Sequence, residues 1–123
     1  MLRLVEMDER TPLSAQMEAK EVEPVILINQ FTVEPAEAEQ LLKAWAADAA
    51  WMKQQPGFIS TQLHRGIGGS GVFINYAVWE STEHFKRAFT NLEFQSKLGH
   101  YPSSAVASPH LFRKVAVLGI CVG

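Results

Sequence analysis

The chain has 123 residues, which suits a single domain with a hydrophobic core. Hydrophobic residues make up 47% of the chain and charged residues 20%, a composition typical of globular proteins. A formal net charge of −2 provides no basic field for nucleic acid and no polybasic patch for a membrane, so we expect neither partner. The single cysteine, Cys121, excludes an intrachain disulfide and a cysteine-rich zinc site. With no signal-peptide pattern and no run of about 20 apolar residues, we expect a cytoplasmic protein.

The first 23 residues differ in composition from the rest of the chain. Residues 1–23 carry more acidic than basic side chains, with apolar residues scattered between them. This composition predicts an N-terminal extension that is either mobile or an arm docking on a partner subunit. Residues 24–123 are then expected to form one domain.

A strand and a helix open that domain. Residues 25–33 are rich in β-branched types and contain no breaker, which predicts a strand. Pro35 then begins a helix that extends to about Gln54, because apolar side chains recur at i, i+3 and i+4 spacing. Both alternating faces of the strand carry large apolar groups, so both faces of the sheet need covering. A second subunit packed sheet to sheet, in a homodimer, would cover the face that the helices leave open.

Two further strands are predicted to form a hairpin. The sequence Gln-Pro-Gly at 55–57 ends the helix, and residues 58–65 are expected to form the second strand. A glycine-rich connection at 66–71 leads into a third strand at 72–79. We place His64 on the face of Phe58, Ser60 and Gln62, where it could line a cavity.

The remainder of the chain completes a β-α-β-β-α-β order. Ser81 is expected to cap a second helix and Asn91 a further turn. Residues 102–109, rich in Pro and Ser, are predicted to form a loop, and residues 110–122 the last strand. This order indicates an α+β, ferredoxin-like βαββαβ fold, with an antiparallel sheet and helices on one face.

The third strand carries the residue that most needs a functional explanation. Strand alternation places Asn75 on one face with Phe73, Ala77 and Trp79. A buried amide costs free energy unless it is hydrogen-bonded, so Asn75 has a polar partner, contacts water or binds a ligand.

Other kinds of chemistry find little support in the sequence. The four histidines show no spacing typical of a metal site, and no metal is expected. Five glutamates lie where helices are expected to begin, and the helix dipole explains them there. No nucleophile has a base beside it. Amides and aromatic side chains remain, a set that suits a flat conjugated ligand.

Two sequence segments resemble the antibiotic biosynthesis monooxygenase family. They are Gln-Pro-Gly-Phe at 55–58 and Asn-Tyr-Ala-Val-Trp-Glu-Ser at 75–81, in the family's order and within a similar stretch from about 25 to 118. The resemblance implies a dimeric α+β barrel built from the ferredoxin-like unit. It thus agrees with the fold expected from the pattern of strands and helices.

The resemblance also implies an activity and a set of site residues. In the cofactor-independent members, an Asn and a Trp that match Asn75 and Trp79 assist oxidation of a phenol or anthrone by dioxygen to a quinone. No metal, flavin or other cofactor is then expected, and Asn75 and Trp79 are the predicted catalytic residues. Phe85 stands at the family's Tyr position, and Gly99 stands near its Arg position. The predicted substrate-binding residues are Asn29, His64, Tyr76, Phe85, Phe89 and Tyr101.

Two alternatives remain open at this point. The heme-degrading members of the family suggest heme as a cofactor, with Asn29 matching their first-strand Asn. Their Trp falls at Ala88 and their heme ligand near Leu98, with His100 two residues further on. The third possibility is a dimer that binds or isomerises a small molecule without oxygen chemistry.

Overall fold

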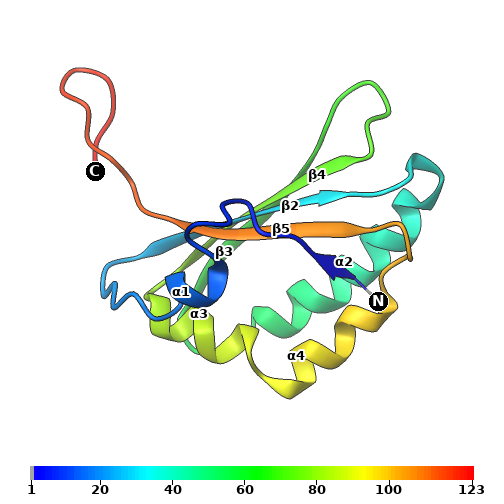
Figure 1. Ribbon diagram of the computed structural model, residues 1–123, viewed down its shortest axis with the longest axis horizontal. Coiled ribbons are helices and arrows are strands. Elements are labelled where there is room, and N and C mark those ends of the chain that lie inside the picture. Colours follow the sequence, from blue (N-terminus) through cyan, green and yellow to red (C-terminus); the bar gives the residue numbers. More distant parts are fainter. Residues whose placement is uncertain (1) are drawn as a thin grey trace.

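The structure is a computed structural model that describes residues 2–123, and its centre is a five-stranded sheet (Figure 1). The strand order is β1-β5-β2-β4-β3. All neighbouring strands are antiparallel except β1, which runs parallel to β5. The strands are β1 (Arg3–Leu4), β2 (Val25–Thr32), β3 (Phe58–Arg65), β4 (Val72–Trp79) and β5 (Val106–Phe112).

The main helices cover one face of this sheet, below it in Figure 1. A 3-10 turn, Pro35–Glu37, leads into α2, and a second one, Leu98–His100, follows α4. The helices are α1 (Leu13–Gln16), α2 (Ala38–Met52), α3 (Thr82–Phe89) and α4 (Leu92–Lys97). The predicted α+β ferredoxin-like fold is therefore confirmed, with β1 as an additional edge strand. No helix in residues 2–123 combines the length and the hydropathy needed to cross a bilayer.

The hydrophobic core lies between the helices and the inner face of the sheet, in two clusters. One is centred on Phe31, Leu41 and Phe73, and the other on Trp79 and Phe85. Trp51, Met52 and Phe89 are partly buried and pack against both clusters. An internal site would therefore lie between the helices and this face of the sheet.

Both helix N-caps expected from the sequence are confirmed. The Ser81 hydroxyl accepts a hydrogen bond from the backbone N–H of His84 at 3.2 Å. The Asn91 side-chain oxygen accepts one from the N–H of Glu93 at 2.8 Å. Each cap satisfies a backbone donor that the first helical turn would otherwise leave unpaired.

The last strand lies earlier in the chain than its composition predicts. The prediction of a loop at 102–109 and a strand at 110–122 is wrong, because β5 is Val106–Phe112 and no strand follows it in the described chain. Pro109 is tolerated because β1 pairs only with Val106 and Ala107, which leaves an edge position where proline breaks no pairing. Residues 113–123 leave the sheet (Figure 1). They carry exposed apolar side chains, including Leu118 and Ile120.

A bulge in β3 corrects the expected facing of His64. Phe58 lies opposite Trp79 on the inner face, but the register shifts between Phe58 and Ser60. Ser60, Gln62 and His64 consequently lie on the outer face, with His64 opposite Ile74. The strict alternation that grouped His64 with Phe58 is interrupted by one extra residue, as is typical of a β-bulge.

The N-terminal residues pack along β5. The backbone N–H of Leu111 donates to the Gln16 side-chain oxygen at 2.9 Å, and the Gln16 amide N–H donates to the Leu111 carbonyl at 3.1 Å. Leu2 and Leu13 are buried, with 6% and 5% of their surfaces exposed. In this arrangement β1 and Gln16 satisfy backbone groups at the edge of β5.

Candidate active site

A cavity that is partly open to solvent lies between the inner face of the sheet and the helices. Its lining is mainly aromatic and aliphatic, with a few polar groups, as is typical of small-molecule sites. The lining residues are Leu2, Leu27, Asn29, Phe31, Trp45, Asp48, Ala49, Met52, Phe58, Thr61, Asn75, Ala77, Trp79, Phe85, Phe89, Phe94, Tyr101 and Pro109.

Two asparagines lie at the centre of the sheet floor. Asn29 of β2 and Asn75 of β4 are directly opposite each other in the antiparallel register. The Thr61 hydroxyl of β3 donates to the Asn75 side-chain oxygen at 2.5 Å, which fixes that amide and leaves its NH₂ group available to a ligand. The Asn29 side-chain oxygen is buried and has no hydrogen-bond partner among the described residues. The floor therefore offers a donor at Asn75 and an acceptor at Asn29.

Trp79 forms the end of the cavity where β4 leads into α3. Only 1% of its surface is exposed, and its ring meets Phe58 and Phe85 edge to face at centroid distances of 5.4 and 6.0 Å. The indole Nε1–H is buried without an acceptor in the described chain. Leaving such a donor unpaired costs about 1–3 kcal/mol. A ligand oxygen in the cavity would supply the missing acceptor.

The helix side of the cavity carries a buried carboxyl group, Asp48 of α2. The Tyr101 hydroxyl donates to Asp48 Oδ2 at 2.5 Å. Burial raises the pKa of the Asp48 carboxyl above its ordinary value, against the opposing effects of the Tyr101 hydrogen bond and of Lys97 and His100. Burial, together with the neighbouring Asp48 carboxylate, also raises the pKa of the Tyr101 hydroxyl.

Sequence reasoning missed Asp48, although the sequence contains a signal for it. The buried face of α2 consists of Ala38, Leu41, Ala44 and Asp48, so Asp48 is the one charged residue in an otherwise apolar stripe. A lone carboxylate at an inward-facing helical position costs free energy to bury and therefore indicates a specific role.

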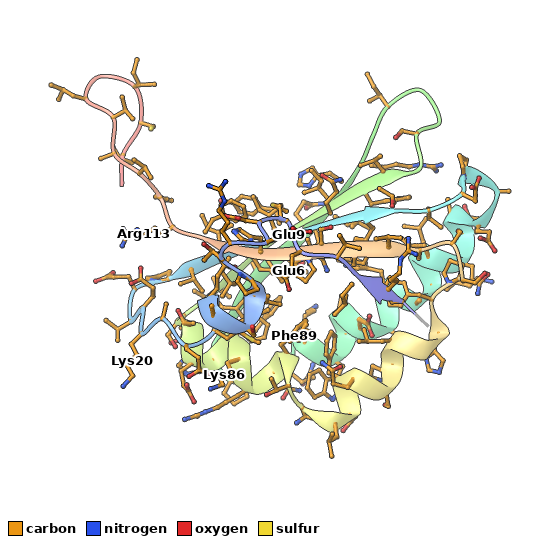
Figure 2. All side chains as sticks on the ribbon, in the orientation of Figure 1. Glu6, Glu9, Lys20, Lys86, Phe89 and Arg113 are labelled. Atoms are coloured by element: carbon orange, nitrogen blue, oxygen red, sulfur yellow. The ribbon has the colours of Figure 1, made fainter. Side chains whose placement is uncertain are left out.

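The structure brings most of the predicted site residues together. His64 and Tyr76 are on the opposite face of the sheet and do not line the cavity. Figure 2 shows Phe89 in the layer between the helices and the sheet. The predicted residues that line the cavity are Asn29, Asn75, Trp79, Phe85, Phe89 and Tyr101.

The lining does not fit heme. None of the histidines lies among the cavity residues in the described chain. His84 is hydrogen-bonded to Ser81, and His110 contacts Gln16 on the outer side of β5. No group of three or more potential metal ligands occurs in residues 2–123. An axial imidazole ligand, as expected for the heme alternative, therefore has no candidate in this cavity.

Three relatives show what the chain is similar to. Deoxynogalonate monooxygenase from Streptomyces nogalater is 34% identical over 76 residues, which make up 60% of this chain and 62% of the relative. The crystal structure of SnoaB, a cofactor-independent oxygenase from Streptomyces nogalater, superposes with a TM-score of 0.67 at 28% identity, over 79% of this chain and 98% of SnoaB. A mycobilin-producing heme oxygenase from Mycobacterium tuberculosis is 27% identical over 97 residues, covering 79% of this chain and 92% of that protein.

The family assignment rests on the domain that holds the cavity. The sequence model of the family described as antibiotic biosynthesis monooxygenase matches residues 24–96, more than half of the chain. This range extends from β2 to the end region of α4 and contains both Asn75 and Trp79. The chain therefore belongs to the antibiotic biosynthesis monooxygenase family.

Proposed function

We propose that this protein is a cofactor-independent monooxygenase that oxidises an aromatic phenol or anthrone-type substrate with dioxygen to a quinone. The observation that carries the proposal is an aromatic cavity in which Trp79 Nε1 and Asn29 Oδ1 are buried without partners in the described chain. Unpaired polar atoms in an apolar cavity favour a flat ligand that carries its own oxygen atoms. Similarity to SnoaB, a cofactor-independent oxygenase, supports the same interpretation.

The reaction consumes only the substrate and dioxygen. The substrate loses a proton from a CH₂ group between its rings, and the electron pair enters the conjugated system. The carbanion reduces dioxygen, and the resulting hydroperoxide at that carbon loses water to leave a carbonyl group. The overall change, CH₂ + O₂ to C=O + H₂O, balances because both oxygen atoms are fully reduced, one in the carbonyl group and one in water.

The proposed catalytic residues hold the charge that develops in this sequence. The NH₂ group of Asn75 would donate to the enolate oxygen, and because Thr61 already fixes the amide, little reorganisation is needed. A preorganised donor of this kind contributes about 2–4 kcal/mol to the transition state. Trp79 would donate from Nε1 to a substrate or peroxide oxygen. Phe85 and Phe89, stacked at a centroid distance of 5.4 Å, supply an apolar wall for the rings.

The direct test is oxygen-dependent turnover by the purified, chelator-treated protein. A panel of hydroxyanthrones and hydroquinones is mixed with the protein in air and under nitrogen, and quinone formation is followed by absorbance. We expect quinone formation above the buffer rate in air only, with one dioxygen consumed for each quinone formed from an anthrone. No turnover across the panel, or turnover that requires added metal, flavin or heme, would contradict the proposal.

We also propose that the functional unit is a homodimer. The outer face of the sheet carries exposed apolar side chains, among them Ile74 and Tyr76 with 37% and 39% of their surfaces exposed. The exposed apolar residues of 113–123 leave the sheet beyond β5 and could extend such a contact. Light scattering should give twice the monomer mass, and Tyr76→Glu should shift the protein toward monomer. A monomeric wild-type protein at micromolar concentration would refute the homodimer proposal.

A further inference from the structure

The reaction above requires a group that accepts the substrate proton, and the cavity contains one carboxylate. Asp48 and Tyr101 are the only lining residues with titratable side chains in the described chain. Asp48 is 6% exposed, and its Oδ1 atom is buried with no hydrogen-bond partner among residues 2–123. Its other oxygen accepts the Tyr101 hydrogen bond. One carboxylate oxygen is thus anchored, and the other has no partner in the described chain.

A purely structural role explains this carboxylate poorly. Buried carboxylates are usually stabilised by a cation, yet no Lys, Arg or His nitrogen of the described chain lies within 4.0 Å of Asp48. The neighbouring inward positions of α2, Leu41 and Ala44, are apolar and pack in the core. An apolar residue at position 48 would avoid the desolvation cost, so the carboxylate indicates a functional requirement.

We propose that Asp48 accepts the proton from the substrate and that Tyr101 is the positioning residue that holds its carboxylate. This inference rests on the proposed function. In the step, the substrate C–H or O–H bond breaks and an O–H bond forms at Asp48 Oδ1. The electron pair moves through the conjugated system to the oxygen atom held by the Asn75 amide. Asp48 later returns the proton to the peroxide anion. The O–O bond then breaks, the outer oxygen leaves as water with that proton and the second C–H proton, and the inner oxygen remains in the carbonyl group.

The environment of Asp48 suits this role. Burial raises the pKa of its carboxyl group, which brings its basicity nearer to that of a weakly acidic carbon or phenol. The Tyr101 hydrogen bond and the charges of Lys97 and His100 lower the Asp48 pKa and so favour the ionised carboxylate. Because this carboxylate is the one anionic side chain among the described residues of the cavity, the substrate should be neutral before it binds, without an acidic substituent near Asp48.

Ionisation of a bound probe tests the proposal without oxygen chemistry. Under nitrogen, 1,8-dihydroxyanthrone is titrated with wild-type protein, Asp48→Asn and the control Glu39→Gln, and the anion is read from its visible absorbance. Glu39 is an exposed carboxylate on the same helix, so its substitution makes the same charge change away from the cavity. We expect the anion with wild-type protein and Glu39→Gln, and at least a tenfold smaller anion fraction with Asp48→Asn.

The two proposals fail in different ways in this experiment. A bound probe that stays neutral with wild-type protein, or an anion that persists with Asp48→Asn, would overturn the role of Asp48. Asp48→Asn activity equal to that of wild-type protein in air would overturn it as well, since an amide can donate a hydrogen bond but cannot accept the proton. Anion formation under nitrogen without quinone formation in air would instead overturn the oxygenase function and leave Asp48 as proton acceptor.

Tyr101→Phe supplies a second readout that does not depend on the folding of Asp48→Asn. The substitution removes the hydrogen bond that lowers the Asp48 pKa, while Lys97 and His100 still face the carboxylate. The midpoint of probe ionisation, measured against pH, should therefore move to higher pH. A packing role for Tyr101 would change thermal stability without moving that midpoint, so an unchanged midpoint would overturn the positioning role.

Discussion

Gly57 joins the end of the α2 segment to β3, and replacing it with alanine should destabilise the cap of α3. Its φ of +86° lies in the left-handed region, which costs an alanine about 1–2 kcal/mol. The new Cβ would also lie 2.2 Å from Cγ of His84. The His84 ring is bonded to the Ser81 hydroxyl at 2.7 Å, so its displacement disturbs a helix cap worth about 1 kcal/mol. We expect a total loss of about 2–3 kcal/mol, or roughly 6–15 °C in Tm.

Thermal unfolding followed by circular dichroism separates the two contributions. Gly68→Ala is the matched control, because Gly68 has a similar φ of +74° but no atom within 4 Å of the place that the new methyl group would occupy. Gly68→Ala should lose only the part of the stability that the positive φ costs an alanine. Removing the ring in Gly57→Ala/His84→Ala should relieve the clash, although the Ser81–His84 hydrogen bond is lost as well. Equal Tm values for Gly57→Ala and Gly68→Ala would refute the argument that His84 packs against Gly57.

Three other outcomes are expected. Asn75→Ala should lower kcat/KM by about 10²–10³-fold while leaving Tm within a few degrees of the wild-type value. Gln62→Ala, on the outer face of the sheet, should leave kcat/KM unchanged. Equal kcat/KM for Asn75→Ala and wild-type protein would remove Asn75 from the mechanism. Deleting residues 1–23 should lower Tm by several degrees, because burial of Leu2 and Leu13 contributes about 1.5–3 kcal/mol each, and an unchanged Tm would mean that the arm is mobile. Asp48→Asn should gain stability relative to wild-type protein as pH rises. The pKa of the Asp48 carboxyl is raised above 3.8 in the folded state, so its protonation favours folding at pH values below 3.8, and this contribution is lost as pH rises through the folded-state pKa. Asp48→Asn has no such contribution to lose. If the stability difference between the two proteins in urea unfolding did not change with pH, the burial argument would be contradicted.

Local sequence patterns predict much of this fold because each element carries its own signals. Strand alternation and the caps at Ser81 and Asn91 mark positions that depend on neighbouring residues alone. The start of β5 and the short β1 could not be found in this way, because their pairing depends on contacts across the whole chain. Pro109 resembles a loop residue until its edge position in the sheet is known.

The residues of the candidate site also differ in how far local sequence patterns predict them. Asn75 and Trp79 could be predicted together because they are four residues apart on one strand face. The bulge at Phe58–Ser60 reversed the facing of His64, and a one-residue shift of this kind has no signal in a single sequence. Asp48 was overlooked because carboxylates usually lie on solvent-facing helix positions, although its spacing from Leu41 and Ala44 places it on the buried face of α2.

The unpaired atoms of the cavity also restrict the ligand. Trp79 Nε1 requires an acceptor, whereas Asn29 Oδ1 requires a donor, and both atoms are already desolvated in the described chain. A ligand with a carbonyl and a hydroxyl group can satisfy both, while a hydrocarbon of the same shape leaves both unpaired. Since each missing hydrogen bond costs about 1–3 kcal/mol, anthracene should bind at least about tenfold more weakly than 1,8-dihydroxyanthrone in a tryptophan-quenching titration under nitrogen. Equal affinities would mean that these two atoms do not contact the ligand and that the aromatic walls alone select it.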